Sequence, residues 1–287
     1  LCLPVWGSQA SAQKPESYAV LDETTGTLTF KHDTKKPAGA YQLNSPDEVP
    51  GWFVEDHRNG IDVNKNRIEK VVFDASFADA RPTSCRCWFV GCNELKSIEG
   101  IEYLNTENVT NMREMFENCN NLTTLDVSKF NTKNVTDMEW MFFGCNNLTE
   151  LNVSNFDTRN VTDMSSMFYE CGKLTTLNVS KFNTEKVTDM EWMFYGCNNL
   201  TTLNVANFKT QNVTNMGKMF YGCNNLTTLN LSNFDTQNVT DMKSMFYGCN
   251  NLTTLNVSNF DTKNVTNMGS MFDGCNNLTT LNVLSLI

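Results

Sequence analysis

Cysteines recur at a fixed interval of 26 residues through more than half of this chain. The members of the series are Cys119, Cys145, Cys171, Cys197, Cys223, Cys249 and Cys275. All 14 methionines fall in the same frame, as pairs that begin with Met112 and Met115. A period of this length is typical of proteins in which each repeat is one structural unit and buries its apolar face on the next unit. The spacing therefore predicts a stack of repeats with a long surface, an architecture that disfavours an enzyme with one enclosed pocket.

The first part of each repeat has the apolar spacing of a helix. In the copy at 135–160, one face of a helix would carry Val135, Met138, Met141, Phe142 and Cys145. A threonine and an aspartate near the start suit a helix N-terminus, and a glycine before the cysteine suits its end. The pattern predicts a helix of about two turns, which packing against other parts of the protein must stabilise.

The second part of each repeat follows the pattern L-x-x-L-x-V-x-x-F. It is close to the core motif of leucine-rich repeats and predicts a short strand in which Leu148, Leu151 and Val153 point inward. Parallel strands stack about 4.8 Å apart, whereas packed helices lie about 8–10 Å apart. We therefore expect an α/β solenoid, a curved leucine-rich-repeat-like stack with short parallel strands on its concave face and short helices on the other.

Composition and repeat pattern divide the chain into four segments. Residues 1–12 open with apolar residues and end in an Ala-x-Ala motif, which is typical of the end of a secretory signal peptide. Residues 13–82 contain no copy of the repeat, and residues 83–108 form an imperfect first copy. Residues 109–287 hold the array, with six complete copies up to Asn264 and a truncated seventh.

The segment before the imperfect repeat is predicted to cap the array. Its strands are expected at Tyr18–Leu21, Leu28–Phe30 and Ile68–Phe73, with a turn between the first two. The first repeat of a stack needs a cover, because it would otherwise expose an apolar layer. We expect a small β-rich cap on the imperfect repeat, sealed by Trp52 and Phe53. A separate binding domain is the alternative.

The repeat unit resembles that of a known family. Its consensus is N-V-T-[DN]-M-x-x-M-F-x-G-C-N-N-L-T-x-L-N-V-S-N-F-D-T. This unit is similar to the 26-residue bacterial surface protein repeat of BspA-like leucine-rich-repeat proteins, and upstream segments such as Val71–Phe77 and Ile98–Thr106 match as well. The last copy departs from the pattern at residues 284–287. The resemblance implies secretion or display on a bacterial cell, binding of macromolecules of a host or neighbouring cell, and no catalytic residues.

Charge and residue usage argue against other functions. The formal charge is −10 at pH 7 and the pI is about 4.7, which disfavours binding to nucleic acid. The chain has two histidines, and no motif for a nucleophile, a phosphate loop or a metal site accompanies them. No stretch of the sequence is apolar enough to cross a membrane as a helix. We predict a protein that is not an enzyme and has no catalytic residue, metal or cofactor.

The seven periodic cysteines are predicted to form a structural ladder of buried free thiols. Each takes the same place beside apolar residues, where a small hydrophobe is wanted, and a free cysteine behaves as one. Disulfides between successive repeats are the alternative. Cys85, Cys87 and Cys92 are less regular and are better candidates for a disulfide.

The outward-facing residues of the predicted strands form the candidate binding face. Regular hydroxyls and amides on a sheet can hydrogen-bond a glycan or an extended peptide. The alternative is a solvated face that is rich in threonine because threonine favours strands. The face comprises Thr124, Glu150, Thr176, Thr202, Thr228, Thr254, Asn152, Asn178, Asn204, Asn230 and Asn256.

Two tryptophans are candidate exposed aromatics. Trp140 and Trp192 take the place opposite the buried face of the predicted helix, and exposed tryptophans often anchor partners. Phe143 and the tyrosines that follow it at the same place are expected near an edge of the stack. Packing between neighbouring helices is the favoured interpretation for these tyrosines, and it is an equal alternative for the two tryptophans.

Together these patterns predict a secreted or cell-surface adhesion protein of a bacterium. It would contact an extracellular protein or glycan of a host or neighbouring cell through the faces of the solenoid. The alternative is a structural spacer that displays another domain and has no ligand of its own. Binding of ice by the threonine and asparagine lattice is a third, weaker hypothesis.

Overall fold

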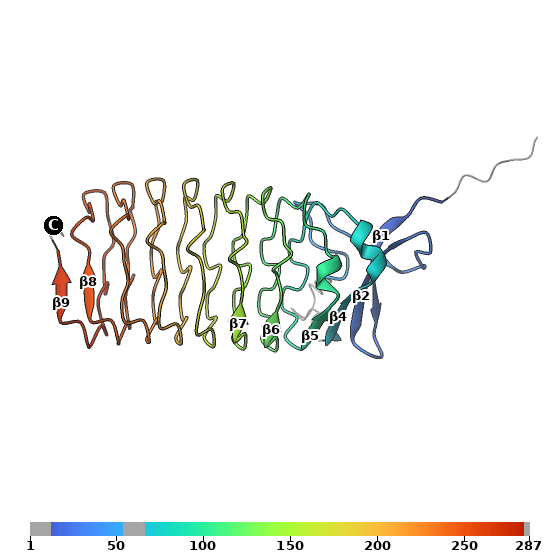
Figure 1. The fold of residues 1–287 in the computed structure, drawn as a ribbon, viewed down its shortest axis with the longest axis horizontal. Helices are drawn as coiled ribbons and strands as arrows, with labels where there is room; N and C mark the ends of the chain where they lie inside the picture. Colours follow the sequence, from blue (N-terminus) through green and yellow to red (C-terminus); the bar gives the residue numbers. More distant parts are fainter. Residues whose placement is uncertain (1–12, 54–66, 284–287) are drawn as a thin grey trace, which may run out of the picture.

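The computed structural model describes residues 13–53 and 67–283. The predicted signal segment at 1–12 and the atypical end at 284–287 lie outside the described residues. The molecule is elongated, with the first strands at one end and the repeats following along the long axis (Figure 1). Its elements in chain order are β1 (Glu16–Asp22), β2 (Thr27–Asp33), β3 (Tyr41–Gln42), β4 (Lys70–Phe73), η2 (Ala75–Asp79), β5 (Ser97–Glu99), η3 (Ile101–Tyr103), β6 (Thr124–Leu125), β7 (Glu150–Leu151), β8 (Thr254–Asn256) and β9 (Thr280–Asn282), where η marks a short 3₁₀-helix.

The predicted hairpin at the start of the chain is confirmed. β1 and β2 pair antiparallel, with Leu21 opposite Leu28. The carboxylate of Asp22 accepts hydrogen bonds from the backbone N–H and the hydroxyl of Thr24, at 2.9 and 2.6 Å. Gly26 then takes a left-handed conformation, with φ of 62°. Local side-chain bonds and one glycine therefore fix the turn.

One mixed sheet joins the hairpin to the repeats. Its strand order is β3-β1-β2-β4-β5, and β4, the third predicted strand, pairs in parallel with β2 and with β5. β5 lies inside the imperfect repeat at 83–108. The sheet thus continues across the border at which composition separated the cap from the array.

An aromatic cluster seals the cap on the imperfect repeat. The ring of Phe30 stacks on Phe73 and Trp88, with centroids 4.6 and 5.0 Å apart, and meets Trp52 edge-on at 5.2 Å. The indole N–H of Trp52 donates to the carbonyl of Trp88 at 2.7 Å, and the indole N–H of Trp88 donates to Asn44 Oδ1 at the same distance. Trp52 is 2% exposed, as predicted for a sealing residue. Both buried indoles are therefore satisfied.

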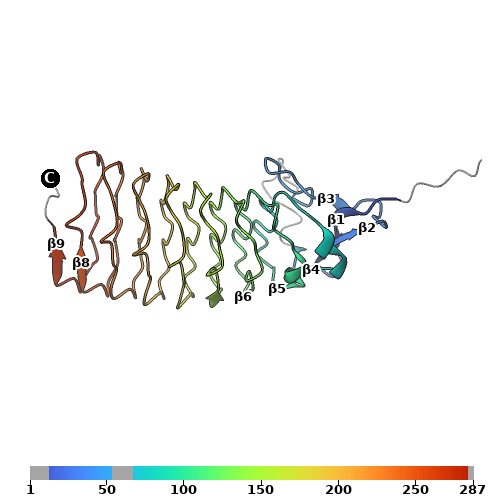
Figure 2. The same cartoon turned by 45° about the horizontal axis from the view of Figure 1, so that its top comes forward.

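Successive repeats lie one on the next along the long axis (Figures 1 and 2). We call each level of this stack a rung. Equivalent residues face each other between rungs, because β6 pairs with β7 and β8 with β9 in parallel. A second line of parallel bridges joins Ser84 to Asn111, Asn111 to Asp137, Asp137 to Asp163, Asp163 to Asp189, Asp189 to Asn215, Asn215 to Asp241 and Asp241 to Asn267.

The helices predicted for the repeats are absent, so this part of the prediction was wrong. No helix occurs between residues 109 and 283, all of which the structure describes. The predicted helical segment instead runs through consecutive turns. The N–H of Phe142 bonds to the carbonyl of Met167 one rung on, at 3.0 Å, whereas the N–H of Cys145 bonds back to Phe142 at 3.2 Å. Left-handed residues such as Trp140 (φ 59°) and Gly144 (φ 69°) interrupt any helix.

The spacing of the rungs explains why turns replace helices. The rings of Phe142 and Phe168, in neighbouring rungs, have centroids 5.8 Å apart, and those of Tyr195 and Tyr221 lie 4.5 Å apart. Packed helices need about 8–10 Å between their axes. Turns keep the strand-like spacing and also bond to the next rung. The wider helical side, from which the curvature of the stack was predicted, is therefore missing.

The apolar side chains still point inward at the predicted positions. The first part of the repeat buries Val135, Met138, Met141, Phe142 and Cys145 completely, and the second part buries Leu148 and Val153 completely and leaves Leu151 6% exposed. Equivalent residues of neighbouring rungs continue the same core into the aromatic cluster of the cap. This continuous core fixes which side chains are left for the surface.

Candidate functional site

On the strand face of the stack, exposed and buried side chains alternate along each strand. Glu150 and Asn152 are exposed on either side of Leu151, which points into the core. The same alternation recurs in each rung, because extended backbone turns successive side chains to opposite faces. All eleven residues of the predicted binding face are exposed in the structure.

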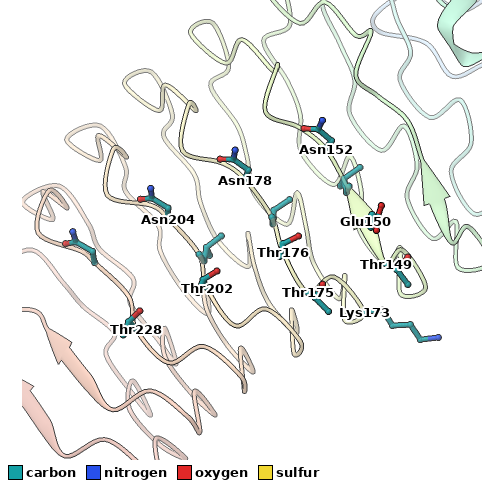
Figure 3. A pocket seen from close by; sticks show the side chains of 14 residues that line it. Thr149, Glu150, Asn152, Lys173, Thr175, Thr176, Asn178, Thr202, Asn204 and Thr228 are labelled. Carbon is teal, nitrogen blue, oxygen red and sulfur yellow. The ribbon is translucent and has the colours of Figure 1, made fainter.

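Eight of the eleven line one groove of about 860 Å³, which we call the strand groove. Figure 3 shows its asparagines in one row and its threonines in a second row beside them. The eight are Glu150, Thr176, Thr202, Thr228, Asn152, Asn178, Asn204 and Asn230.

The other three predicted residues lie beyond the strand groove. Thr124 lines a smaller neighbouring groove of about 370 Å³, which shares Glu150 and Asn152 with the strand groove. Thr254 and Asn256 lie on β8 and line neither groove.

Hydrogen bonds within each rung orient the asparagines of the groove. The Oδ1 atom of Asn178 accepts the backbone N–H and the hydroxyl of Ser180, at 3.2 and 2.7 Å. Asn204 likewise accepts the N–H of Ala206 at 3.2 Å, and Asn230 that of Ser232 at 3.1 Å. Because Oδ1 is engaged in the turn, each side chain offers its Nδ2 hydrogens to the groove. The row therefore presents hydrogen-bond donors at one-rung intervals.

Sequence reasoning missed one charged residue of the site. Lys173 lines the strand groove and is exposed, where it lies beside Thr149 and Thr175 (Figure 3). The pair Gly172-Lys173 stands where the other complete repeats carry two asparagines. This departure from an otherwise regular pattern was the available sequence signal. Together with Glu150, which stands where other repeats have threonine, it gives one end of the groove both charges.

The two candidate tryptophans are half-buried and not exposed as predicted. The ring of Trp140 stacks on Phe143 with centroids 5.1 Å apart. The Nζ atom of Lys218 lies 5.1 Å from the centre of the Trp192 ring, and the buried Nε1 of Trp192 has no hydrogen-bond partner among the described residues. The prediction placed both tryptophans on the face of a helix opposite to its buried face. Without that helix, the tryptophans lie against their neighbours in the turns.

The periodic cysteines form a core ladder of free thiols. Six of the seven are buried, and Cys275 is half-buried. The thiol of Cys145 donates to the carbonyl of Phe116 at 3.1 Å, and the equivalent bond recurs along the array. Burial raises the pKa of Cys145 to about 12. These thiols therefore stay protonated and are poor nucleophiles at neutral pH.

Among the described residues, the irregular cysteines of the imperfect repeat also form no disulfide. Cys85, Cys87 and Cys92 are buried, and the disulfide for which they were the better candidates does not form between them. The thiol of Cys87 donates to a carboxylate oxygen of Glu114 at 3.1 Å. Burial, followed by the charge of Glu114, raises the pKa of Cys87 to about 12.

Residues 13–53 and 67–283 contain no cluster of three or more histidine, cysteine or acidic side chains placed to hold a metal ion. Within the same ranges, no helix has the length and apolar character needed to cross a membrane.

The repeat array of this chain matches a known protein family. The model of the family described as "Mycoplasma protein of unknown function, DUF285" matches residues 83–203 and 189–283, which is more than half of the chain. The chain belongs to this family. The resemblance of its repeat to the bacterial surface repeats of BspA-like leucine-rich-repeat proteins is thereby confirmed. No curated protein matches the chain.

Two solved structures are similar to this DUF285 chain. One is a leucine rich cell surface protein from Faecalibacterium prausnitzii A2-165, with 15% identity, 96% of each chain covered and a TM-score of 0.35. The other is a leucine-rich repeat protein from Eubacterium ventriosum ATCC 27560, with 14% identity, 95% of this chain and 94% of that chain covered, and a TM-score of 0.28.

Proposed function

We propose that this DUF285 protein is displayed on or secreted from a bacterial cell and binds an extracellular protein or glycan of a host or neighbouring cell. The strand groove is the proposed site. The row of asparagine amides carries the proposal, because each amide keeps its Nδ2 donors for a ligand while its Oδ1 is held in a turn. Regular donors along an open groove suit an extended chain that carries hydrogen-bond acceptors at short intervals.

The threonines beside the amides fit the same proposal. Thr176, Thr202 and Thr228 are exposed, and their hydroxyls make no hydrogen bond with any residue that the structure describes. Leu177 and Leu203 lie between the two rows with 6% of their surface exposed. A ligand in the groove would therefore meet polar groups along two rows above a narrow apolar strip.

A matched pair of variants tests the proposal. Asn204→Asp keeps an Oδ1 acceptor for the turn and replaces the Nδ2 donors by a second acceptor. Aspartate fits this place, because Asp126 makes the same bond to the N–H of Ser128 at 2.9 Å. Asn256→Asp is the control, since Asn256 makes the same kind of turn outside the groove.

Wild type and both variants would be screened against extracellular matrix proteins, mucins and glycans. We expect at least one ligand to bind, and Asn204→Asp to weaken it about tenfold, which corresponds to one lost hydrogen bond of about 1.4 kcal/mol. Asn256→Asp should bind like wild type. Folded protein that binds nothing in the panel, or equal losses in both variants, would contradict the proposal.

The alternative function is a spacer that holds another domain away from the cell. The regular stacking of the rungs favours it, because such an array is long and uniform. Deletion of residues 161–212, which form two complete repeats, separates the two functions. A spacer should only become shorter, whereas a binding protein should lose affinity because the deletion removes part of the strand groove.

A further inference from the structure

A second groove, of about 760 Å³, lies along the turns of the array, and we call it the tyrosine groove. Lys173 lines both this groove and the strand groove, so the two lie side by side. Three columns of equivalent residues make up most of its lining. They are Tyr195, Tyr221 and Tyr247, then Gly196, Gly222, Gly248 and Gly274, and then Asn198, Asn224 and Asn250.

The groove exists because four successive rungs have glycine at one left-handed position. Gly222 has φ of 68°. A Cβ added at Gly222 would lie 3.5 Å from Asn198 Oδ1 and 3.7 Å from Gly196 Cα. The position does not require glycine, because Asn118 and Glu170 occupy it in other rungs with φ of 56° and 53°. Side chains at those rungs take the space that the glycines leave open, and Glu170 borders the groove.

The tyrosine column supplies hydroxyls. Tyr195, Tyr221 and Tyr247 stack face to face, with successive centroids 4.5 and 4.6 Å apart. Their ring faces are therefore covered by each other. Burial, followed by the neighbouring hydroxyls, raises the pKa of Tyr221, so its phenol stays protonated at neutral pH. Each protonated hydroxyl can both donate and accept a hydrogen bond.

Two members of the asparagine column supply free amides, whereas Asn250 Oδ1 accepts a hydrogen bond from Asn276 Nδ2 at 3.3 Å. Among the described residues, the carboxamides of Asn198 and Asn224 have no hydrogen-bond partner. The backbone beside them is already paired, because the N–H of Gly222 bonds to the carbonyl of Tyr247 at 2.7 Å and the carbonyl of Gly222 accepts the N–H of Asn224 at 2.8 Å. An extended peptide that adds to a sheet needs free backbone groups. The groove offers side chains only.

The charged residues that line the tyrosine groove limit the class of ligand that it can bind. Glu170 and Lys173, at one end, are the two charged residues that line the groove, and they have opposite signs. The rest of the lining is tyrosine, asparagine and glycine. A polyanion would find one cation there on a protein of net charge −10. A ligand rich in neutral hydroxyls would find both donors and acceptors along the groove.

We propose that the tyrosine groove binds a neutral oligosaccharide that lies extended along the stack. Sugar hydroxyls both donate and accept hydrogen bonds, as the phenols and carboxamides that line the groove do. The four glycines at rungs about 4.8 Å apart give the chain an open path of about 15 Å. This site goes beyond the proposed function of the strand groove and does not rest on it.

Titration calorimetry with cellohexaose, xylohexaose and mannohexaose tests the proposal, and hexagalacturonate and an extended peptide are titrated for comparison. The variants are Asn224→Asp, which removes the amide donors at the surface, and Gly222→Asn, which fills the groove with a residue that this backbone position accepts at Asn118. Asn256→Asp, which lies outside both grooves, is the control, and Thr202→Val tests whether the sugar binds in the strand groove instead. Thermal unfolding of each variant verifies that it folds, and Asn224→Asp carries the test if Gly222→Asn does not fold.

We expect at least one hexasaccharide to bind, Asn224→Asp and Gly222→Asn to weaken it tenfold or more, and Asn256→Asp to leave it unchanged. Three results would overturn the proposal. They are no binding of any hexasaccharide by folded protein, equal binding by wild type and Asn224→Asp, and tighter binding of hexagalacturonate or an extended peptide at this groove. A loss confined to Thr202→Val would assign sugar binding to the strand groove instead.

Discussion

At the scale of single residues, aspartates and asparagines shape the turns of every rung. Asp137 Oδ1 accepts the N–H of Glu139 at 3.0 Å, and Asn215 makes the same bond to Gly217 at 3.0 Å. The aspartates at this place were predicted to lie at helix starts, yet the bond that Asp137 makes is that of a turn. Either residue type serves, because the turn needs only one side-chain oxygen.

The aspartates of this ladder predict a pH dependence. Desolvation by burial raises the pKa of Asp137 and of Asp189 to about 6. Because these values exceed the ordinary value of 3.8, the folded protein binds protons more tightly than the unfolded chain between about pH 4 and 6. Stability should therefore fall as the pH rises through this window. Asp137→Asn should remove the penalty, since asparagine occupies the same place at Asn215.

Thermal unfolding of Asp137→Asn at two pH values provides the measurement. At pH 7.5 we expect the variant to be more stable than wild type by about 1 kcal/mol, a value that allows for the partial solvent exposure of Asp137. At pH 4 we expect the two proteins to be equally stable. Asp126→Asn is the control, because hydrogen bonds from Ser128 lower the pKa of Asp126. It should lose stability at pH 7.5. A gain for Asp137→Asn at pH 4 and none at pH 7.5 would refute this account.

At the scale of elements, the turn segment is the part that a helix was expected to form. Lys218 lies in this segment with φ of 54° and sits over the ring of Trp192. A left-handed conformation costs a residue with a side chain about 1–2 kcal/mol, and β-branched residues tolerate it least. Glycine adopts it freely.

Two substitutions at Lys218 distinguish a turn from a helix. Both Lys218→Gly and Lys218→Val remove the contact with Trp192, so they differ only in backbone preference. In a helix, valine would be slightly more stable than glycine. In the left-handed turn, we expect Lys218→Gly to be more stable than Lys218→Val by about 1–2 kcal/mol. Urea unfolding measures the difference in stability. If Lys218→Val were the more stable variant, the segment would be a helix and not a turn.

The sequence pattern predicted the buried residues of this segment correctly and its backbone incorrectly. Val135, Met138, Met141, Phe142 and Cys145 satisfy a helical period, but they also point inward along a chain of turns that bonds to the next rung. Periodicity records which side chains face the core and not the hydrogen bonds that place them there. The strand part was easier to predict, because alternation has one common structural meaning.

The candidate site could be predicted to a similar extent. The threonine and asparagine rows follow from strand alternation, so eight predicted residues meet in the strand groove. The exposure of Trp140 and Trp192 was predicted from a helix. Because this helix is absent, their position could not be predicted from the sequence. The tyrosine groove depends on which residues flank the left-handed glycines, and no single-rung pattern shows that they line one cavity.

At the scale of the whole molecule, the stack has one core and two distinct sides. The aromatic cluster around Phe30 covers the first rung, and the buried side chains continue from it along the array. Each rung contacts mainly its neighbours, so the stability of such an array is about the sum of rung and interface contributions. The two grooves run along this stack, and both depend on equal rung spacing.

The rungs are equally spaced on the strand side and on the turn side, and pulsed electron paramagnetic resonance tests this spacing most directly. Spin labels at Thr149 and Thr279 report the strand side, and labels at Thr136 and Thr266 report the turn side, both five repeats apart. Both pairs should give about 24 Å, five steps of about 4.8 Å. A turn-side distance of about 40–50 Å, as packed helices would require, would contradict the structure.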